Sequence, residues 1–116
     1  MKLFAATISF TFISISLIAQ KEANIWHFGH GYGLDFNSGE AVQITGSMET
    51  FEGCTSVCDS AGNLLFYSNG GGRVPIGGQS TGIIWNANGD VMYDMQGLEG
   101  GGFSAAQSSV IIPAPG

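Results

Sequence analysis

The sequence carries the same residue pattern twice, at 57–67 and at 84–93, and this repeat most restricts the possible folds. In each copy an apolar pair precedes an Asx residue, two small or polar residues, a glycine, a second Asx residue and an apolar run. Asx side chains bond the backbone two residues on, and glycine tolerates positive φ, so the pattern predicts two β-hairpins in series. The predicted turn residues are Asp59, Gly62 and Asn63 in the first copy, and Asn86, Gly89 and Asp90 in the second.

The chain as a whole is predicted to be all-β, an antiparallel meander of short hairpins. Apart from the N-terminal segment, no part of it has a sustained helical period. Serial hairpins favour a β-propeller, in which 55–93 would form one four-stranded blade and 108–112 would open the next; a β-sandwich is the alternative. The expected strands are 24–28, 41–45, 55–58, 63–68, 82–85, 90–93 and 108–112. Between them we expect a glycine-rich break at 29–33, a short extended piece at 34–36, a connector at 46–52 and glycine-rich loops at 69–82 and 95–103.

Residues 1–19 have the layout of a signal-peptide helix. Lys2 provides the positive start, the stretch from Leu3 to Ala19 has no charge, and polar chain follows. We expect cleavage between Ala19 and Gln20, and export across the inner membrane. A membrane anchor is the alternative, but the apolar run is at the short limit for a span and ends at Lys21. Residues 20–116 would then be an incomplete propeller-like N-terminal region of a larger protein, because a strand-like run and a turn opening, Pro115-Gly116, stand at its end.

The charge balance excludes some partners. The formal net charge is −6, and beyond the predicted signal peptide the only lysine and arginine are Lys21 and Arg73. Nucleic-acid binding needs a basic footprint, and an anionic membrane attracts a basic patch, so neither partner is expected. We also expect no stable membrane insertion once the signal peptide is removed.

A further pattern is carried, in this order, by the segments 26–29, 33–39, 51–54, 59–67, 85–86 and 107–113. Together these segments resemble the start of large secreted proteins of the Bacteroidota. The resemblance implies a propeller-like N-terminal region in a protein sorted by type IX secretion to the outside or the outer cell surface, often described as gliding-motility-associated. Two features depart from that pattern: residues 70–82 look like an insertion, and His27 and His30 stand where an aromatic and a small polar residue are expected.

No metal or phosphate site is expected. His27 and His30 provide two ligands, fewer than zinc usually takes. Residues 86–90 alternate oxygen ligands like a calcium loop, but Val91 stands where that loop needs glycine, and 59–63 fit no better. The glycine-rich 29–33 run has no helix start after it, which a phosphate-binding loop requires.

No catalytic or cofactor-binding residue is expected either. Glu49 with Glu52, or Asp90 with Asp94, are conceivable acid pairs, but acids beside turns are usually just solvated. Ser104, Ser108 and Ser109 have no nucleophile-elbow motif around them. Cys54 and Cys58 lie roughly 13 Å apart in an extended run. A disulfide needs Cα atoms within about 7 Å, so no bridge between them is predicted.

The functional expectation is an exported, non-enzymatic surface or extracellular module for adhesion or for protein or glycan contact. Tyr32 and the 70–82 loop are candidate contact points, because loops on a rigid β scaffold often carry binding. One alternative is an accessory part of an exported polysaccharide hydrolase. Another is a gene remnant without function, which cooperative unfolding of residues 20–116 would argue against.

The two hairpin glycines offer a direct test of the repeat. We expect Gly62→Val and Gly89→Val each to lower the urea midpoint more than Gly71→Val, because only the first two are predicted to have positive φ. Equal midpoints for all three variants would contradict the repeat.

Overall fold

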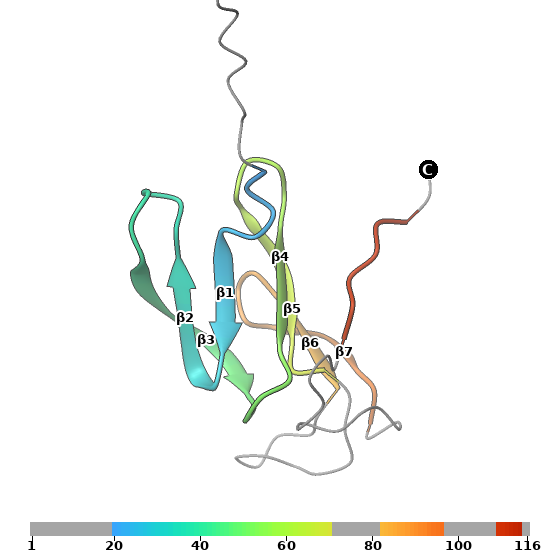
Figure 1. Cartoon of the computed structure of the whole chain (residues 1–116). Coiled ribbons are helices and arrows are strands. Elements are labelled where there is room, and N and C mark those ends of the chain that lie inside the picture. The colour runs from blue at the N-terminus through green and yellow to red at the C-terminus, as the bar shows by residue number, and fades with distance from the viewer. Residues whose placement is uncertain (1–19, 71–81, 97–108, 115–116) are drawn as a thin grey trace, which may run out of the picture.

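The computed structural model describes residues 20–70, 82–96 and 109–114, which fold into two antiparallel β-sheets with no helix among them (Figure 1). The all-β, antiparallel prediction is therefore confirmed. The predicted signal-peptide helix and its cleavage point at Ala19, Gly71, Arg73 and most of the two glycine-rich loops lie outside the described residues. Sheet A has the order β1 (Ile25–Phe28), β2 (His30–Asp35), β3 (Val42–Glu49); sheet B has the order β4 (Thr55–Cys58), β5 (Leu64–Ser68), β6 (Ile83–Asn86), β7 (Val91–Asp94).

The first turn of sheet B, between β4 and β5, is organised by Asp59. Its Oδ1 accepts the N–H groups of Ala61 and Asn63 at 2.9 Å each, and its Oδ2 accepts the side-chain amide of Asn63 at 2.9 Å. Gly62 donates its N–H to the Asp59 carbonyl at 3.0 Å and has a φ of 91°. These bonds satisfy the turn backbone locally, and they hold the pKa of the Asp59 carboxyl below its usual value, chiefly through Asn63.

The second turn, between β6 and β7, repeats this geometry. Asn86 Oδ1 accepts the N–H groups of Asn88 at 2.9 Å and Asp90 at 3.0 Å, and Gly89 has a φ of 84°. The side chains at the two ends exchange roles, because Asn86 here donates its amide to Asp90 at 3.1 Å. One acid and one amide therefore close each turn, in either order.

The repeat extends into the strands. The register of β4 with β5 shifts next to Cys58, and the register of β6 with β7 shifts next to Trp85, at equivalent distances from the two turns. Each shift leaves one unpaired residue on the second strand, Leu65 and Met92, and both are exposed. The four strands from Thr55 to Asp94 form a single sheet, as two consecutive hairpins predict.

Sheet A departs from the expected strand limits. The glycine-rich segment 29–33 was predicted to separate two strands, but β2 already begins at His30 and includes most of that segment. At Gly33 a side chain would press on the Trp26 carbonyl and on His27, so this glycine gives the neighbouring strand room to approach. β3 continues to Glu49 instead of ending at Thr45, because a bulge lets it go on pairing with β2.

Residues 109–114, in contrast, form no strand, although 108–112 was expected to be one. Within the described residues they pair with no neighbour in a ladder. Residues 109–112 instead line an apolar pocket of about 290 Å³ together with Phe66 and Ile84 of sheet B and with Met95, which follows β7. Ser109 and Ile111 are half-buried there, whereas Val110 and Ile112 are exposed. The segment runs beside sheet B (Figure 1).

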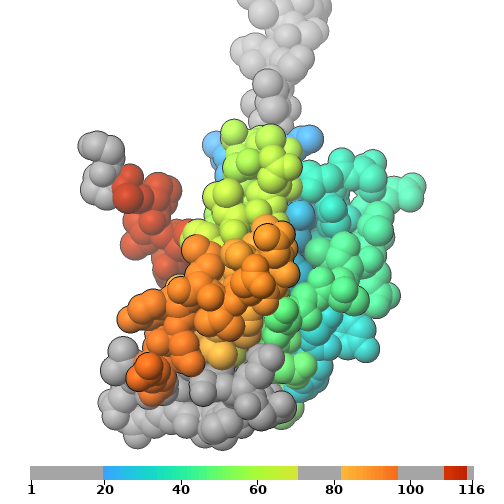
Figure 2. All heavy atoms as spheres, turned by 180° about the vertical axis from the view of Figure 1, so that it is seen from behind, coloured from blue at the N-terminus to red at the C-terminus, as the bar shows by residue number. Residues whose placement is uncertain are grey.

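The core lies between the two sheets. Met48 of β3 is fully buried, and it clusters with Tyr67, Ile83 and Trp85 of sheet B. Seen from behind, the β6–β7 hairpin lies against β3 (Figure 2). The sheets are also joined by hydrogen bonds, of which the Ser47 N–H to the Tyr67 hydroxyl, 3.0 Å long, crosses from β3 to β5.

Gly39 provides a comparison for the hairpin glycines, because it has a φ of 89° with open space around it. Valine there should cost about 1–3 kcal/mol from backbone strain alone. At Gly62 a side chain would also overlap Asn37, and at Gly89 it would meet Ser47, so Gly62→Val and Gly89→Val should lower the unfolding free energy by more than Gly39→Val. Urea titration of the three variants measures this, and an equal loss in all three would contradict the tight fit of the turns.

Candidate functional site

One face of sheet A presents exposed aromatic rings. Phe28 and Tyr32 stand directly opposite each other in the β1–β2 ladder, and Trp26 lies two residues before Phe28, so all three side chains share a face. Their exposed fractions are 51% for Trp26, 37% for Phe28 and 52% for Tyr32. These three residues are called the aromatic surface below. Trp26 is held in place by a 2.7 Å hydrogen bond from its indole N–H to the Ala23 carbonyl.

The aromatic surface borders a pocket of about 390 Å³ between β1 and β4, called the seam pocket below. Its lining is mostly apolar. A β1 backbone N–H, that of His27, donates to Ser56 Oγ of β4 at 2.9 Å and so holds the two strands beside each other. The seam pocket is lined by Ala23, Trp26, His27, Phe28, Cys54, Thr55 and Ser56.

The two thiols are not activated. Cys54 is exposed and Cys58 buried, and both are free cysteines. Burial raises the pKa of each thiol, and for Cys58 the nearby carboxylates of Asp59 and Asp35 add to this rise, whereas the backbone of Ile25 and Asn24 opposes it. Since the thiolate is the nucleophile, neither cysteine has the environment of a reactive group.

His27 lies in the interface between the sheets. Its imidazole, 4% exposed, stacks on Tyr67 with ring centroids 4.1 Å apart, and Tyr67 in turn stacks on Trp85 at 5.4 Å. Burial lowers the pKa of His27, and the backbone carbonyl of Tyr32 acts weakly in the opposite direction. His27 Nδ1 has no hydrogen-bond partner among the described residues.

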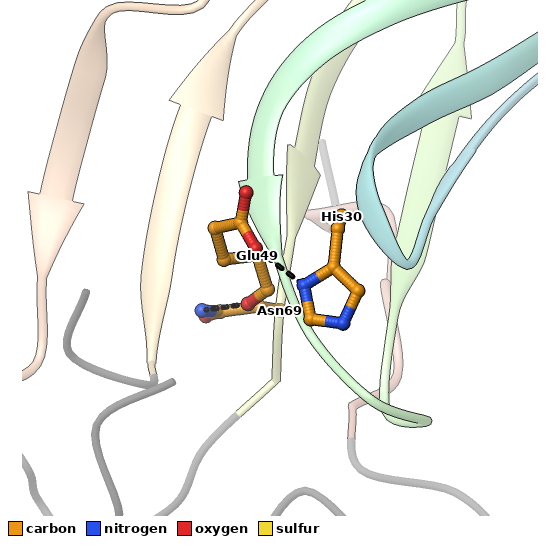
Figure 3. A network of polar contacts seen from close by, with 3 residues as sticks. All are labelled: His30, Glu49 and Asn69. Atoms are coloured by element: carbon orange, nitrogen blue, oxygen red, sulfur yellow. Dashed lines mark hydrogen bonds and ion pairs between the residues drawn. The ribbon is translucent and has the colours of Figure 1, made fainter. Parts of the chain in front are cut away.

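His30 belongs to a network with Glu49 and Asn69 (Figure 3). Its Nδ1 pairs with the Glu49 carboxylate, and its ring meets Phe51 edge-on. The Glu49 carbonyl accepts the side-chain amide of Asn69 at 3.2 Å. His27 and His30 thus make different contacts, and the described part of the chain holds no group of three or more potential metal-ligating side chains.

Asn69 was not singled out from the sequence, although its side chain is buried at a junction. Its Oδ1 accepts the N–H groups of both Gly82 and Ile83 at 2.9 Å, so it joins the two ends of the segment that was predicted as an insertion. The only sequence signal for this role of Asn69 is its position as a polar residue just after an aromatic strand. Ordinary turn residues have the same position, so the signal does not distinguish Asn69 from them.

Three of the four acids named as conceivable pairs make identified contacts. Glu49 binds His30, Asp90 closes the second turn, and Asp94 accepts the N–H of Gln96 at 2.7 Å. Ser104 and Ser108 lie outside the described residues, as does most of the 70–82 loop. Within the described ranges, no helix has the length and apolar character to cross a membrane.

Comparisons with known proteins found no family model, no curated protein and no solved structure that matches this chain. The candidate site is therefore defined by its own geometry, which is an exposed aromatic surface beside an apolar pocket on an antiparallel scaffold.

The buried imidazole predicts a pH dependence of stability. Because the pKa of folded His27 is lowered, the unfolded chain takes up a proton at this residue first as the pH falls below its ordinary value of about 6.5. The contribution of His27 to the unfolding free energy should then fall with pH until the folded pKa is reached. Urea titrations between about pH 7 and pH 5 measure the slope.

The His27→Phe variant is the control, since it keeps a stacked ring and every other titrating group. The difference in slope between the native chain and this variant isolates His27. Identical slopes would show that the imidazole titrates alike in the folded and unfolded chain.

Proposed function

We propose that this chain is an exported, non-enzymatic module that makes adhesion contacts at the cell surface or outside the cell, and that its aromatic surface binds a protein partner. The observation that carries the proposal is the exposure of Trp26, Phe28 and Tyr32 on one sheet face. Tryptophan and tyrosine are enriched among the residues that dominate binding energy in protein interfaces. Export rests on the signal-peptide pattern of residues 1–19.

The composition of the site favours a protein over a glycan at this surface. The seam pocket is mostly apolar, and its volume of about 390 Å³ suits an apolar anchor side chain from a partner. Phe36 packs on Trp26 with ring centroids 5.0 Å apart, which supports the indole from the side. A rigid aromatic beside an apolar pocket binds with little loss of conformational freedom.

A propeller-type architecture, as in the secreted proteins that the sequence resembles, is the arrangement we favour for the two sheets. Sheet B is a four-stranded meander, the form of one blade, and sheet A stacks on one of its faces. The first strands of the two sheets, β1 and β4, lie beside each other, as the inner strands of neighbouring blades do. Residues 109–112 on the other face of sheet B are where a further blade would begin.

A bead-adhesion assay tests the function. Beads coated with the purified chain are applied to layers prepared from the outer cell surface, and the fraction of beads retained under flow is measured. We expect Trp26→Ala to reduce binding at least about tenfold, which corresponds to about 1.4 kcal/mol. Leu65→Ala, which removes a similarly exposed apolar side chain from sheet B, should leave binding unchanged.

Two treatments of the layer identify the partner. Protease should abolish retention of the native beads, whereas periodate oxidation of sugars should not. Sensitivity to periodate alone would overturn the protein assignment, and native-like retention of the Trp26→Ala beads would overturn the role of the aromatic surface. Release of sugars from a polysaccharide layer by the chain would overturn the non-enzymatic assignment.

A further inference from the structure

β7 is the last strand of sheet B, and its outer edge pairs with no strand among the described residues (Figure 1). All of its residues are exposed, and the exposed fractions are 58% for Val91, 58% for Met92 and 56% for Tyr93. Two features of β7, a bulge at Met92 and a charge at Asp94, are of the kinds that can close a sheet edge to other chains. The first hairpin shows what each of them does here.

The bulge at Met92 does not close the edge, because the first hairpin has the same bulge and still takes another strand. The equivalent of Met92 is Leu65 of β5, and directly after it residues 66–68 pair with β6. β5 therefore has a strand on each side despite its bulge. The repeat places residues 93–95 at the equivalent positions of the second hairpin, so this stretch can take a strand in the same way.

The backbone of Asp94 faces this outer edge. Successive residues of an antiparallel strand direct their backbone N–H and C=O groups alternately to one neighbour and to the other. Met95 donates its N–H to the carbonyl of Gly82, just before β6, at 2.9 Å, so the preceding residue, Asp94, faces away from β6. Its equivalent in the first hairpin is Tyr67, which pairs with Trp85 of β6. Asp94 therefore offers an N–H and a C=O to a further strand.

The charge of Asp94 selects the strand that can pair there. Its carboxylate accepts the Gln96 N–H at 2.7 Å and makes no ion pair within the described residues. Asp90 precedes β7, so two carboxylates bracket its three apolar residues. Two copies of this chain that paired along β7 would bring the carboxylates of both together, and like charges across a ladder destabilise it. The edge is thus closed to a second copy and open to a strand of opposite charge.

We propose that the outer edge of β7 binds an extended segment of a partner protein that carries an arginine or a lysine between two apolar residues. The basic residue pairs with Asp94 on one face of the sheet, and the apolar residues contact Tyr93 and Met95 on the other face. β6 meets β5 with the same alternation, since Trp85 stands opposite Tyr67. Main-chain hydrogen bonds give such a complex its affinity, and the side-chain pairs give it specificity.

Two capped peptides test the proposal on the purified chain. Both have the sequence Ser-Thr-Val-X-Val-Thr-Ser, in which X is arginine in one peptide and glutamate in the other. The readout is the backbone amide resonance of Asp94, which moves when its N–H enters a hydrogen bond. The arginine peptide should shift this resonance with a Kd in the range of about 0.1–1 mM, and the glutamate peptide should bind at least about tenfold more weakly.

A reversal of charge at one residue separates this role from a loss of folding. Asp94→Lys should reverse the preference, so that the glutamate peptide binds at least about tenfold more tightly than the arginine peptide. A variant that merely unfolds would lose both peptides. Glu40→Lys is the matched control, because it makes the same change in net charge at an exposed residue of the β2–β3 loop, and it should keep the native preference.

The proposal is overturned if about 5 mM arginine peptide leaves the Asp94 amide unshifted, if the two peptides bind equally, or if Asp94→Lys keeps the native preference. A shift of the Asp94 amide that grows with protein concentration in the absence of peptide would identify a second copy as the occupant, and it would overturn the proposal as well. Trp26→Ala should leave the peptide titration unchanged, because Trp26 belongs to the aromatic surface on sheet A. Failure here and failure of the aromatic surface as a contact site are therefore separable.

Discussion

The stack of His27 on Tyr67 and of Tyr67 on Trp85 is the interaction that holds the two sheets together. It is the point where sheet A, the first hairpin and the second hairpin all meet, and the Tyr67 hydroxyl also accepts the N–H of Ser47 in β3. The buried apolar cluster draws Met48 from sheet A and its other members from sheet B, so the core lies where the two sheets meet. The ring stack therefore decides which faces are buried and which remain available for binding.

Polar side chains complete this arrangement at its ends. Asn37, in the loop between β2 and β3, donates to the Gly62 carbonyl of the first turn at 2.9 Å, and Asn69 links β3 to the start of β6. These bonds satisfy backbone groups that a two-sheet structure would otherwise leave unpaired. The scaffold they support keeps the aromatic surface on the outside of the molecule.

Local signals were enough to predict the hairpins, whereas sheet A was predicted less well. The turns at Asp59–Asn63 and Asn86–Asp90 are formed by hydrogen bonds within five consecutive residues. Their geometry can therefore be predicted from neighbouring residues alone. At Gly33 and Gly46 glycine is needed because another part of the chain passes close by, and a sequence-based reading takes such glycines for loop breaks. The candidate sites depend on the same long-range contacts. Trp26 and Phe28 stand two residues apart on β1 and so share a face, but nothing local indicates that this face is the exposed one.

The sequence by itself determined the strand-and-turn repeat, the antiparallel class and the acidic, charge-poor character, because each of these follows from residues near one another or from composition alone. Only the tertiary structure decided that His27 is buried while His30 pairs with Glu49, that β3 bulges between Gly46 and Met48, and that Asn69 joins two segments separated in the chain. Those outcomes depend on which faces the ring stack brings together. Packing between sheets is a property of side chains distant in sequence, and no local pattern encodes it.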